Sequence, residues 1–200
     1  MSALRGGGRS RFVLGLVLCL GWLSGCAGPV EPAPAPAEES SDPGVARAAV
    51  TAPMWTVVRA GQLHSLGLQA DGTVWAWGYN RYGQLGNNTT TDRLAPVKVT
   101  GLTGVVVDIA AGNEHSVAVK ADGTVWAWGR NDLGQLGDNT TTQRLKPVKV
   151  SGLTGVMAVA AGYRYSLALK TDGTVWAWGD NASGKLGDGT RVRKLIPVQV

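Results

Sequence analysis

The sequence DGTVWAWG occurs three times in this chain, beginning at Asp71, Asp122 and Asp172. The starts lie 51 and then 50 residues apart, and the likeness extends beyond the motif on both sides. Each copy is preceded by AG-x-x-[HY]-S and followed by N-x-x-G-[QK]-LG, a polar loop and Pro-Val. A repeat of this length is one small unit that cannot bury its own apolar face, so neighbouring copies must stack. The motif therefore predicts a repeat architecture.

Each repeat contains four segments with the composition of β-strands. In the second copy they are residues 105–110, 116–120, 124–129 and a short segment at 147–150 that begins with proline. The first is a β-branched apolar run typical of a buried strand, and Asp122-Gly123 between the second and third predicts a two-residue hairpin loop. Four strands per unit is the content of a β-propeller blade. We therefore expect an all-β fold.

The expected hairpin register assigns the tryptophans to the packing between blades. With a two-residue loop at Asp71-Gly72, Leu66 and Leu68 lie opposite Trp77 and Trp75 and share one bulky face, while the other face carries small residues. Bulky faces would then stack on small ones. This gives a structural role, rather than that of an aromatic platform for sugars or bases, to Trp75, Trp77, Trp126, Trp128, Trp176 and Trp178.

The chain accommodates three such blades, at about residues 54–99, 104–150 and 155–200. Three is below the four to eight blades that close a propeller ring. Three explanations stay open: the sequence is a fragment of a longer protein, the array is an open arc, or copies combine. Two copies would supply six blades, which suggests a homodimer that completes a ring.

The N-terminus has the features of a bacterial lipoprotein signal peptide, residues 1–25. Arg5, Arg9 and Arg11 precede an apolar stretch at 12–22, too short to span a bilayer comfortably. Leu23-Ser24-Gly25-Cys26 then resembles a lipobox, in which the cysteine is lipidated and becomes the mature N-terminus. We expect lipidation at Cys26 and a location in the cell envelope, at the outer membrane or cell surface. The alternative is an ordinary secretory signal.

Residues 26–53 are expected to form an extended tether. They follow the signal peptide and contain six of the nine prolines, together with many alanines. Such a segment cannot bury a core. A lipid at one end and a folded array at the other would display the repeats outside the cytoplasm while holding them at the membrane.

Charge and cysteine content exclude several classes of function. The formal charge is +5, but three arginines lie in the signal peptide, which leaves 16 − 14 = +2 without a sustained basic stripe, so no nucleic-acid partner is expected. Cys19 lies in the signal peptide and Cys26 would be lipidated. We therefore expect no disulfide and no cysteine-based metal site.

The repeat resembles the regulator-of-chromosome-condensation family of β-propellers over about residues 54–200. The resemblance rests on Gly112, His115-Ser116, Asp122-Gly123, Trp128-Gly129, Asn131, Gly134-Gln135-Leu136-Gly137 and Pro147, with their counterparts in the other copies. It implies a propeller that typically closes with seven units. The founding member is an exchange factor for a small nuclear GTPase and binds chromatin, whereas secreted bacterial relatives bind other proteins, including a β-lactamase inhibitor.

The chain departs from this family in ways that argue against exchange activity. No repeat carries the long insertion with which the nuclear exchange factor engages its GTPase, and a signal peptide would remove the chain from the cytosol. The third repeat has Tyr165 where the others have His64 and His115, and Lys185 where the others have glutamine.

The sequence gives little support for catalysis. His64 and His115 occupy equivalent positions, which indicates a structural hydrogen bond at a strand start, and the repeated aspartates are turn residues. Asn131, Asp132, Asp138 and Asn139 lack the ligand spacing of a calcium loop and are interpreted as a turn. We expect no catalytic residues, no metal and no cofactor.

Binding is a better hypothesis than catalysis, because the repeated motif is constant while the residues at several loop positions differ between copies. Tyrosine and arginine are typical interface anchors. The candidate binding surface is Tyr79, Arg81, Tyr82, Arg130, Tyr163 and Arg164. The predicted function is a lipid-anchored scaffold outside the cytoplasm that binds an unknown protein. The alternatives are a carbohydrate- or polysaccharide-binding module that uses the loop tyrosines, a non-functional fragment, or simple drift of exposed loops.

Overall fold

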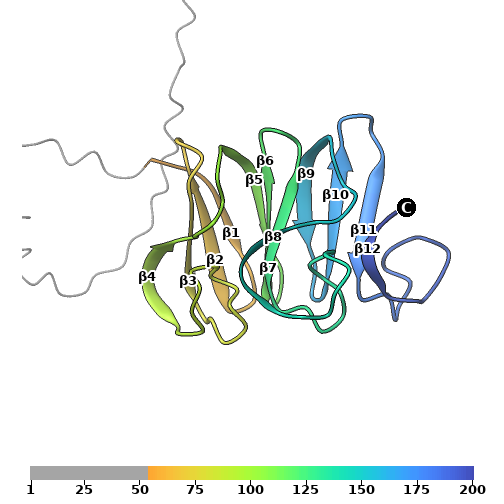
Figure 1. The fold of residues 1–200 in the computed structure, drawn as a ribbon, viewed down its shortest axis with the longest axis horizontal. Coiled ribbons are helices and arrows are strands. Elements are labelled where there is room, and N and C mark those ends of the chain that lie inside the picture. The colour runs from red at the N-terminus through yellow and green to blue at the C-terminus, as the bar shows by residue number, and fades with distance from the viewer. Residues whose placement is uncertain (1–53) are drawn as a thin grey trace, which may run out of the picture. The chain divides into compact units, whose positions relative to one another are not determined.

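The computed structural model describes residues 54–200, so the predicted signal peptide, Cys26 and the tether lie outside the described residues. Twelve strands form three four-stranded antiparallel sheets that stand side by side in chain order (Figure 1), which confirms the all-β fold and the whole-blade phasing. Blade 1 contains β1 (Trp55–Ala60), β2 (His64–Gln69), β3 (Val74–Gly78) and β4 (Arg93–Lys98). Blade 2 contains β5 (Val106–Ala111), β6 (His115–Lys120), β7 (Val125–Gly129) and β8 (Arg144–Lys149). Blade 3 contains β9 (Val156–Ala161), β10 (Tyr165–Lys170), β11 (Val175–Gly179) and β12 (Lys194–Gln199).

These three blades do not close a ring, as their number predicts. The first strands of successive blades approach one another: the carboxylate of Asp108 in β5 accepts a hydrogen bond from the backbone N–H of Val159 in β9 at 2.9 Å. Among residues 54–200 the structure has no helix that could cross a lipid bilayer.

The fourth strand of each blade is longer than its proline suggests. In blade 2 it starts at Arg144, three residues before the expected start at residue 147. Pro147 lies inside it, at an irregularity between the pairs Gly129–Arg144 and Ala127–Val148. Proline has no N–H for the ladder and is accommodated on an edge strand at such an irregularity.

The hairpin between the second and third strands has a longer loop than predicted. The N–H of Gly72 donates to Gln69 O and the N–H of Gln69 donates to Thr73 O, each at 2.9 Å. Gly72 has φ +80°, the left-handed conformation in which glycine ends a three-residue hairpin loop as a bulge. Asp71 accepts the N–H of Thr73 at 2.9 Å and is a turn residue, as expected.

This extra loop residue shifts the strand register by one, so the predicted pairing of leucine with tryptophan is wrong. Trp75 lies opposite Gly67 and Trp77 opposite Ser65, while Leu66 lies opposite Ala76. Each blade thus has an aliphatic face and an aromatic face in which every tryptophan lies across from a small residue. In blade 1 the aliphatic face carries Leu66, Leu68, Val74 and Ala76, and the aromatic face carries Ser65, Gly67, Trp75 and Trp77.

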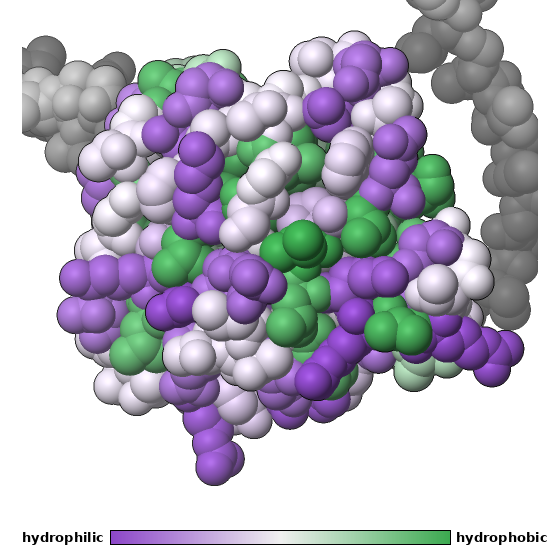
Figure 2. All heavy atoms as spheres, turned by 45° about the vertical axis from the view of Figure 1, so that its right-hand side comes forward, coloured by the Kyte–Doolittle hydropathy of each residue, from purple (hydrophilic) through white to green (hydrophobic). Residues whose placement is uncertain are grey.

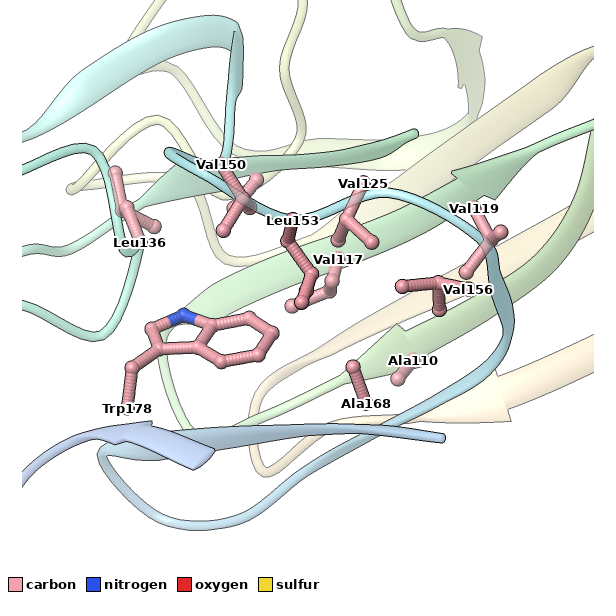
Figure 3. Close-up of a cluster of buried hydrophobic side chains, with 11 residues drawn as sticks. Ala110, Val117, Val119, Val125, Leu136, Val150, Leu153, Val156, Ala168 and Trp178 are labelled. Atoms are coloured by element: carbon pink, nitrogen blue, oxygen red, sulfur yellow. The ribbon is translucent and has the colours of Figure 1, made fainter. Parts of the chain in front are cut away.

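The core lies between blades, where the aliphatic face of one blade packs on the aromatic face of the next. Val117, Val119 and Val125 of blade 2 form one cluster with Ala168 and Trp178 of blade 3 (Figure 3). The aliphatic face of blade 1 clusters in the same way with Ala118 and Trp128 of blade 2. Full burial of each large side chain contributes roughly 1.5–3 kcal/mol. Unlike faces of neighbouring blades stack on one another, as expected, but the residues on each face differ from those predicted.

The second tryptophan of the motif also makes a hydrogen bond between blades. Trp128 and Trp178 are fully buried, and their indole N–H groups donate to the backbone oxygens of Gln84 and Gln135 at 2.8 and 2.9 Å. Trp77 is half-buried and packs edge-to-face on Trp55 instead. The remaining tryptophans, Trp75, Trp126 and Trp176, are half-buried and donate to a threonine two residues earlier.

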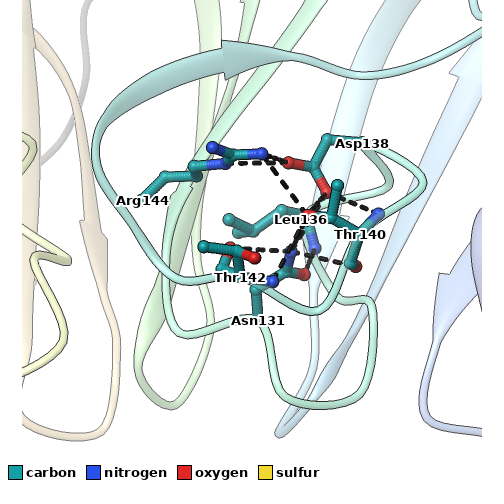
Figure 4. Close-up of polar contacts among 6 residues, drawn as sticks. All are labelled: Asn131, Leu136, Asp138, Thr140, Thr142 and Arg144. Atoms are coloured by element: carbon teal, nitrogen blue, oxygen red, sulfur yellow. Dashed lines mark hydrogen bonds and ion pairs between the residues drawn. The ribbon is translucent and has the colours of Figure 1, made fainter.

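A buried asparagine organises the loop of blade 2 whose backbone oxygen, at Gln135, accepts the tryptophan hydrogen bond (Figure 4). The Asn131 amide donates to Asp138 Oδ1, Thr140 O and Thr142 O at 3.0, 3.1 and 3.0 Å. Its oxygen accepts the N–H of Leu136 at 3.0 Å. The side chain bonds the loop from within, which agrees with the structural-turn interpretation.

We predict that Trp178→Phe destabilises the array more than Trp77→Phe. The first change removes buried volume and the indole bond to Gln135, and should cost ~1–3 kcal/mol. The second affects a half-buried ring and should cost well under that. Urea unfolding followed by circular dichroism measures both. Equal losses would show that the contact between blades does not support the fold as described.

Candidate functional site

A three-group hydrogen-bonded link joins each pair of neighbouring blades near the loops. His64 Nε2 lies 2.9 Å from Ser116 Oγ, and the Ser116 hydroxyl donates to Gln84 O at 2.8 Å. Because the serine hydrogen is committed to the carbonyl oxygen, the histidine donates from Nε2, which assigns its neutral tautomer. His115 and Ser166 repeat the link. The structural hydrogen bond predicted for both histidines is confirmed.

These links fix the glycine turns that precede the second strands. A Cβ added to Gly112 would collide with the His115 ring and lie 2.7 Å from Gly162 O, so the turns pack too closely for any side chain. An open hollow results, lined by residues 60–62, 111–113 and 161–163 from the three blades. Asn113 is 6% exposed there and Tyr163 is 56% exposed.

Loop residues of blades 1 and 2 contact one another. Arg130 of blade 2 forms ion pairs with Glu114 at 2.5 Å and with Asp132 at 2.7 Å. The ring of Tyr82, from blade 1, lies 4.8 Å from the same guanidinium. The arginine is thereby held in one geometry by two carboxylates and an aromatic ring.

Blade 3 continues the same network. Arg164 lies 3.9 Å from Asp132 and 5.2 Å from the ring centre of its neighbour Tyr163. Asp132 therefore joins the two arginines. We call this connected set the Tyr–Arg surface, and it consists of Tyr82, Glu114, Arg130, Asp132, Tyr163 and Arg164.

The network stabilises the charged forms of Arg130 and Asp132. Burial lowers the pKa of Arg130, but its hydrogen bonds to Asp132 and Glu114 outweigh burial and raise that pKa above its ordinary value. Burial raises the pKa of Asp132, and the hydrogen bonds from Arg130 and Gln135 outweigh it, so the net shift is downward. The surface thus combines two guanidinium groups, of Arg130 and Arg164, with two carboxyl groups, of Glu114 and Asp132.

The structure brings together only part of the predicted binding surface. Tyr82, Arg130, Tyr163 and Arg164 join the network. Tyr79 is half-buried and its backbone N–H donates to Leu63 O, while Arg81 is exposed and makes no ion pair with a residue in 54–200. The sequence reasoning missed Glu114 and Asp132. The spacing of Arg130 and Asp132 could have suggested their contact, but not the link from blade 3.

Blade 3 replaces the histidine link with a different contact. Tyr165 stands in the histidine position, with the Lys185 ammonium group 5.5 Å from its ring centre. Lys185 also pairs with Asp180 at 2.6 Å, and that hydrogen bond is the main cause of a lowered pKa at Asp180. Among residues 54–200 no group of three or more His, Cys, Asp or Glu side chains could hold a metal ion.

A family model matches most of the chain. The RCC1-like domain aligns with residues 15–200, a range that starts inside the predicted signal peptide and includes all three blades. Human HERC2, an E3 ubiquitin-protein ligase, is 42% identical over 99 residues, which are 49% of this chain and 2% of that protein. The Arabidopsis thaliana ultraviolet-B receptor UVR8 is 38% identical over 99 residues, 49% of this chain and 22% of the receptor.

Solved propellers have the same arrangement of blades. Human WBSCR16 superimposes with a TM-score of 0.67 at 30% identity, covering 73% of this chain and 37% of that one. Prp20p from Saccharomyces cerevisiae superimposes with a TM-score of 0.67 at 24% identity, over 73% of this chain and 38% of that one, which concerns the fold alone. The chain therefore spans less than two fifths of each of these solved propellers.

We predict that mild acid destabilises the array through its two histidines. Burial chiefly lowers the pKa of His64 to about 4 and that of His115 to about 3, from an ordinary value of 6.5. Between about pH 6.5 and pH 4 the unfolded chain binds protons that the folded chain does not, so the free energy of unfolding falls as pH falls. The loss should reach ~2 kcal/mol for each histidine between pH 7.5 and pH 5.

Urea unfolding at both pH values measures this effect, with the double variant His64→Gln/His115→Gln as control. Glutamine can still donate a hydrogen bond to the serine but does not titrate, and the chain has no other histidine. The control should lose much less stability on acidification. A wild-type stability that is flat over this range would contradict the prediction.

Proposed function

Because the chain belongs to the RCC1-like domain family, we propose that it is a protein-binding scaffold whose contacts run through the Tyr–Arg surface. One observation carries the proposal: the side chains that differ between repeats converge from three blades, on a frame that the repeats hold constant. Repeat proteins commonly vary exposed loop positions to bind partners while the packed residues stay fixed.

The geometry of the Tyr–Arg surface suits a protein interface. Glu114 and Asp132 hold Arg130 in place before any partner arrives, which reduces the side-chain entropy lost on binding. Tyr163 is largely exposed and offers an aromatic ring beside a cation. Since two carboxylates balance two guanidinium groups, the surface favours a partner of mixed polarity over a strongly charged polymer.

The location and the partner are proposed from the N-terminal sequence. A lipid on Cys26 and a tether over residues 26–53 would place the blades in the cell envelope, so the partner would be an envelope protein. Yeast Prp20 binds Kap60, Gsp1p and histones, and these are partners of Prp20 rather than of the scaffold proposed for this chain. Pairing of two copies belongs to the same proposal.

We also propose that the described blades are not catalytic. The charged groups of the Tyr–Arg surface are committed to one another, and neither histidine is accessible, since both are buried and bonded to serine. The ligase name belongs to HERC2, of which this chain matches 2%.

Glycan binding is the second candidate, and one observation favours it. The hollow at the glycine turns combines the exposed ring of Tyr163 with Gln62 and Asn113, whose buried Oδ1 has no hydrogen-bond partner among the described residues. An aromatic ring beside amide groups is a common way to hold a sugar.

Site-specific photo-crosslinking tests the scaffold proposal in intact cells. A photoreactive phenylalanine replaces Tyr82 or Tyr163, and a control carries it at Thr171, an exposed residue in the hairpin turn after β10. We expect the first two positions to give the same protein adduct, which Arg164→Ala should weaken because it removes the cation beside Tyr163. The control should give none.

The crosslinking result also distinguishes protein binding from glycan binding. A protease-resistant, carbohydrate-positive adduct from position 163 alone would favour the glycan. Equal labelling from Thr171, or no adduct from Tyr82 and Tyr163, would contradict both forms of binding at this surface.

We predict that Cys26→Ser releases the protein from membranes. Serine cannot form the thioether, so the chain should lose its lipid and appear in the soluble fraction after cell disruption. Mass spectrometry of the wild-type N-terminal peptide should show diacylglycerol on Cys26. Cys19→Ser is the matched control, since it leaves the lipobox intact. An unmodified Cys26 in the wild-type protein would refute the anchor.

A further inference from the structure

Two arginines of blade 3 approach one aspartate of blade 2 whose carboxylate is already bonded within its own blade. Asp132 accepts hydrogen bonds from Nε and Nη2 of Arg130 at 3.0 and 2.7 Å, and from the Gln135 amide at 3.1 Å. Arg164 Nη1 comes only to 3.9 Å from the same carboxylate. Arg193 Nη1 lies 3.5 Å from the backbone oxygen of Asp132. Both guanidinium groups of blade 3 therefore reach Asp132 without the close ion pair that Arg130 makes.

Arg164 lacks the partners that Arg130 has in a similar setting. The two side chains are 28% and 21% exposed, respectively. Arg130 makes three hydrogen bonds to two carboxylates, whereas Arg164 makes none to a side chain in residues 54–200, and its Nε is buried without a partner there. A guanidinium group carries five N–H donors, and buried donors without an acceptor are costly. Arg164 therefore has donors left for a further acceptor.

The charges around Arg164 leave one positive charge unbalanced. Within the Tyr–Arg surface two carboxylates match two guanidinium groups, and Arg193 adds a third guanidinium group. Asp180, whose charge also acts on Arg164, is paired with Lys185 at 2.6 Å. A group with one negative charge and two acceptor oxygens would restore the balance, and it would match the planar fork of a guanidinium group. A carboxylate has these properties.

The two arginines lie where blade 3 meets blade 2, so the site does not depend on a further blade. In blades 1 and 2 the position of Arg164 is occupied by Leu63 and Glu114, and each of these has a following blade. Even so, Leu63 stays 53% exposed, and Glu114 pairs with Arg130 of its own blade. Arg193 reaches back to blade 2. By the repeat pattern, a blade that followed blade 3 would leave both arginines uncovered.

The site is open to another macromolecule. The ring of Tyr163 is 56% exposed and its centre lies 5.2 Å from the Arg164 guanidinium group, while Arg193 is exposed. In the view turned toward blade 3, hydrophilic side chains project from the lower edge of the molecule (Figure 2), which is the edge at which the loops after the third strands lie in Figure 1. An aromatic ring thus stands beside cations that a partner can reach.

We propose that Arg164 and Arg193 bind a carboxylate of the protein partner, from an aspartate or glutamate side chain. The ring of Tyr163 then packs against the methylene groups next to that carboxylate. Arg130 does not take part directly, because its donors are already used; it holds Asp132 in place. The inference rests on the proposed function for the source of the carboxylate, and it deepens that function by naming the chemical group that the Tyr–Arg surface recognises.

Nuclear magnetic resonance of the full chain in detergent, with isotope-labelled arginine, tests this site. The probe is N-acetyl-glutamate N-methylamide, and the uncharged N-acetyl-glutamine N-methylamide is its match in shape. We expect the glutamate probe to shift the side-chain signals of Arg164 and Arg193 saturably, with a millimolar Kd, and the glutamine probe to leave them unchanged. The signals are assigned by their loss in Arg164→Gln and Arg193→Gln.

The same variants measure the contribution of each arginine. Arg164→Gln and Arg193→Gln should each weaken binding of the glutamate probe about 10-fold. Arg164→Lys keeps the charge but loses the planar pair of donors, so it should retain only part of the affinity. Arg191→Gln is the matched control, since it removes the same charge from an exposed position in the loop of Arg193 and should bind like wild type. Circular dichroism checks that all variants are folded.

Two results with the purified protein would overturn the proposal. One is a glutamate probe that shifts the exposed Arg81 as much as Arg164, or that binds Arg164→Gln as well as Arg191→Gln. The other is binding of inorganic phosphate where the glutamate probe fails, which would assign the two arginines to a phosphorylated ligand.

The crosslinks from Tyr82 and Tyr163 separate this inference from the proposed function. Adducts that persist undiminished in the double variant Arg164→Gln/Arg193→Gln would leave the scaffold standing and reject the carboxylate contact. Binding of the glutamate probe without any adduct in cells would support the arginine site and contradict the scaffold.

Discussion

Two backbone oxygens, those of Gln84 and Gln135, determine how these blades fit together. Each accepts an indole N–H and a serine hydroxyl from the following blade, in a place from which water is excluded. A buried carbonyl oxygen without partners would be costly, so the loop that presents it and the strands that satisfy it require one another. The buried asparagine fixes the loop, the loop fixes the oxygen, and the oxygen fixes the tryptophan of the next sheet.

The repeat period and the division into three four-stranded blades could be predicted from the sequence because each follows from local composition. The hairpin register could not. An Asp-Gly pair suits both a two-residue loop and the longer loop found here, and the difference lies in a hydrogen bond from Gly72 to Gln69. A one-residue error in register exchanges the two faces of a strand. The prediction therefore placed the two tryptophans of each motif on the face that carries the aliphatic residues.

The Tyr–Arg surface was predicted only in part, also for a physical reason. Varying positions in the loops pointed to Arg130 and Arg164, but their common partner Asp132 is decided by how far blade 3 rotates relative to blade 2. That rotation follows from face-to-face packing rather than from any local pattern. Tyr79 follows the same motif as Arg130, but it carries no charge, and Leu63 and Arg81 stand in blade 1 where blade 2 has the carboxylates of Glu114 and Asp132.

The contacts between blades join residues about one repeat apart in the chain. His64 and Ser116 are 52 positions apart, and His115 and Ser166 are 51 apart. Each interface therefore involves only consecutive blades, and none depends on how many blades the array contains. In genetic terms the unit of change is the whole repeat: an in-frame duplication or deletion of about 50 residues would create or remove one interface of a type already present. Arrays of different length could thus arise without redesign of the core.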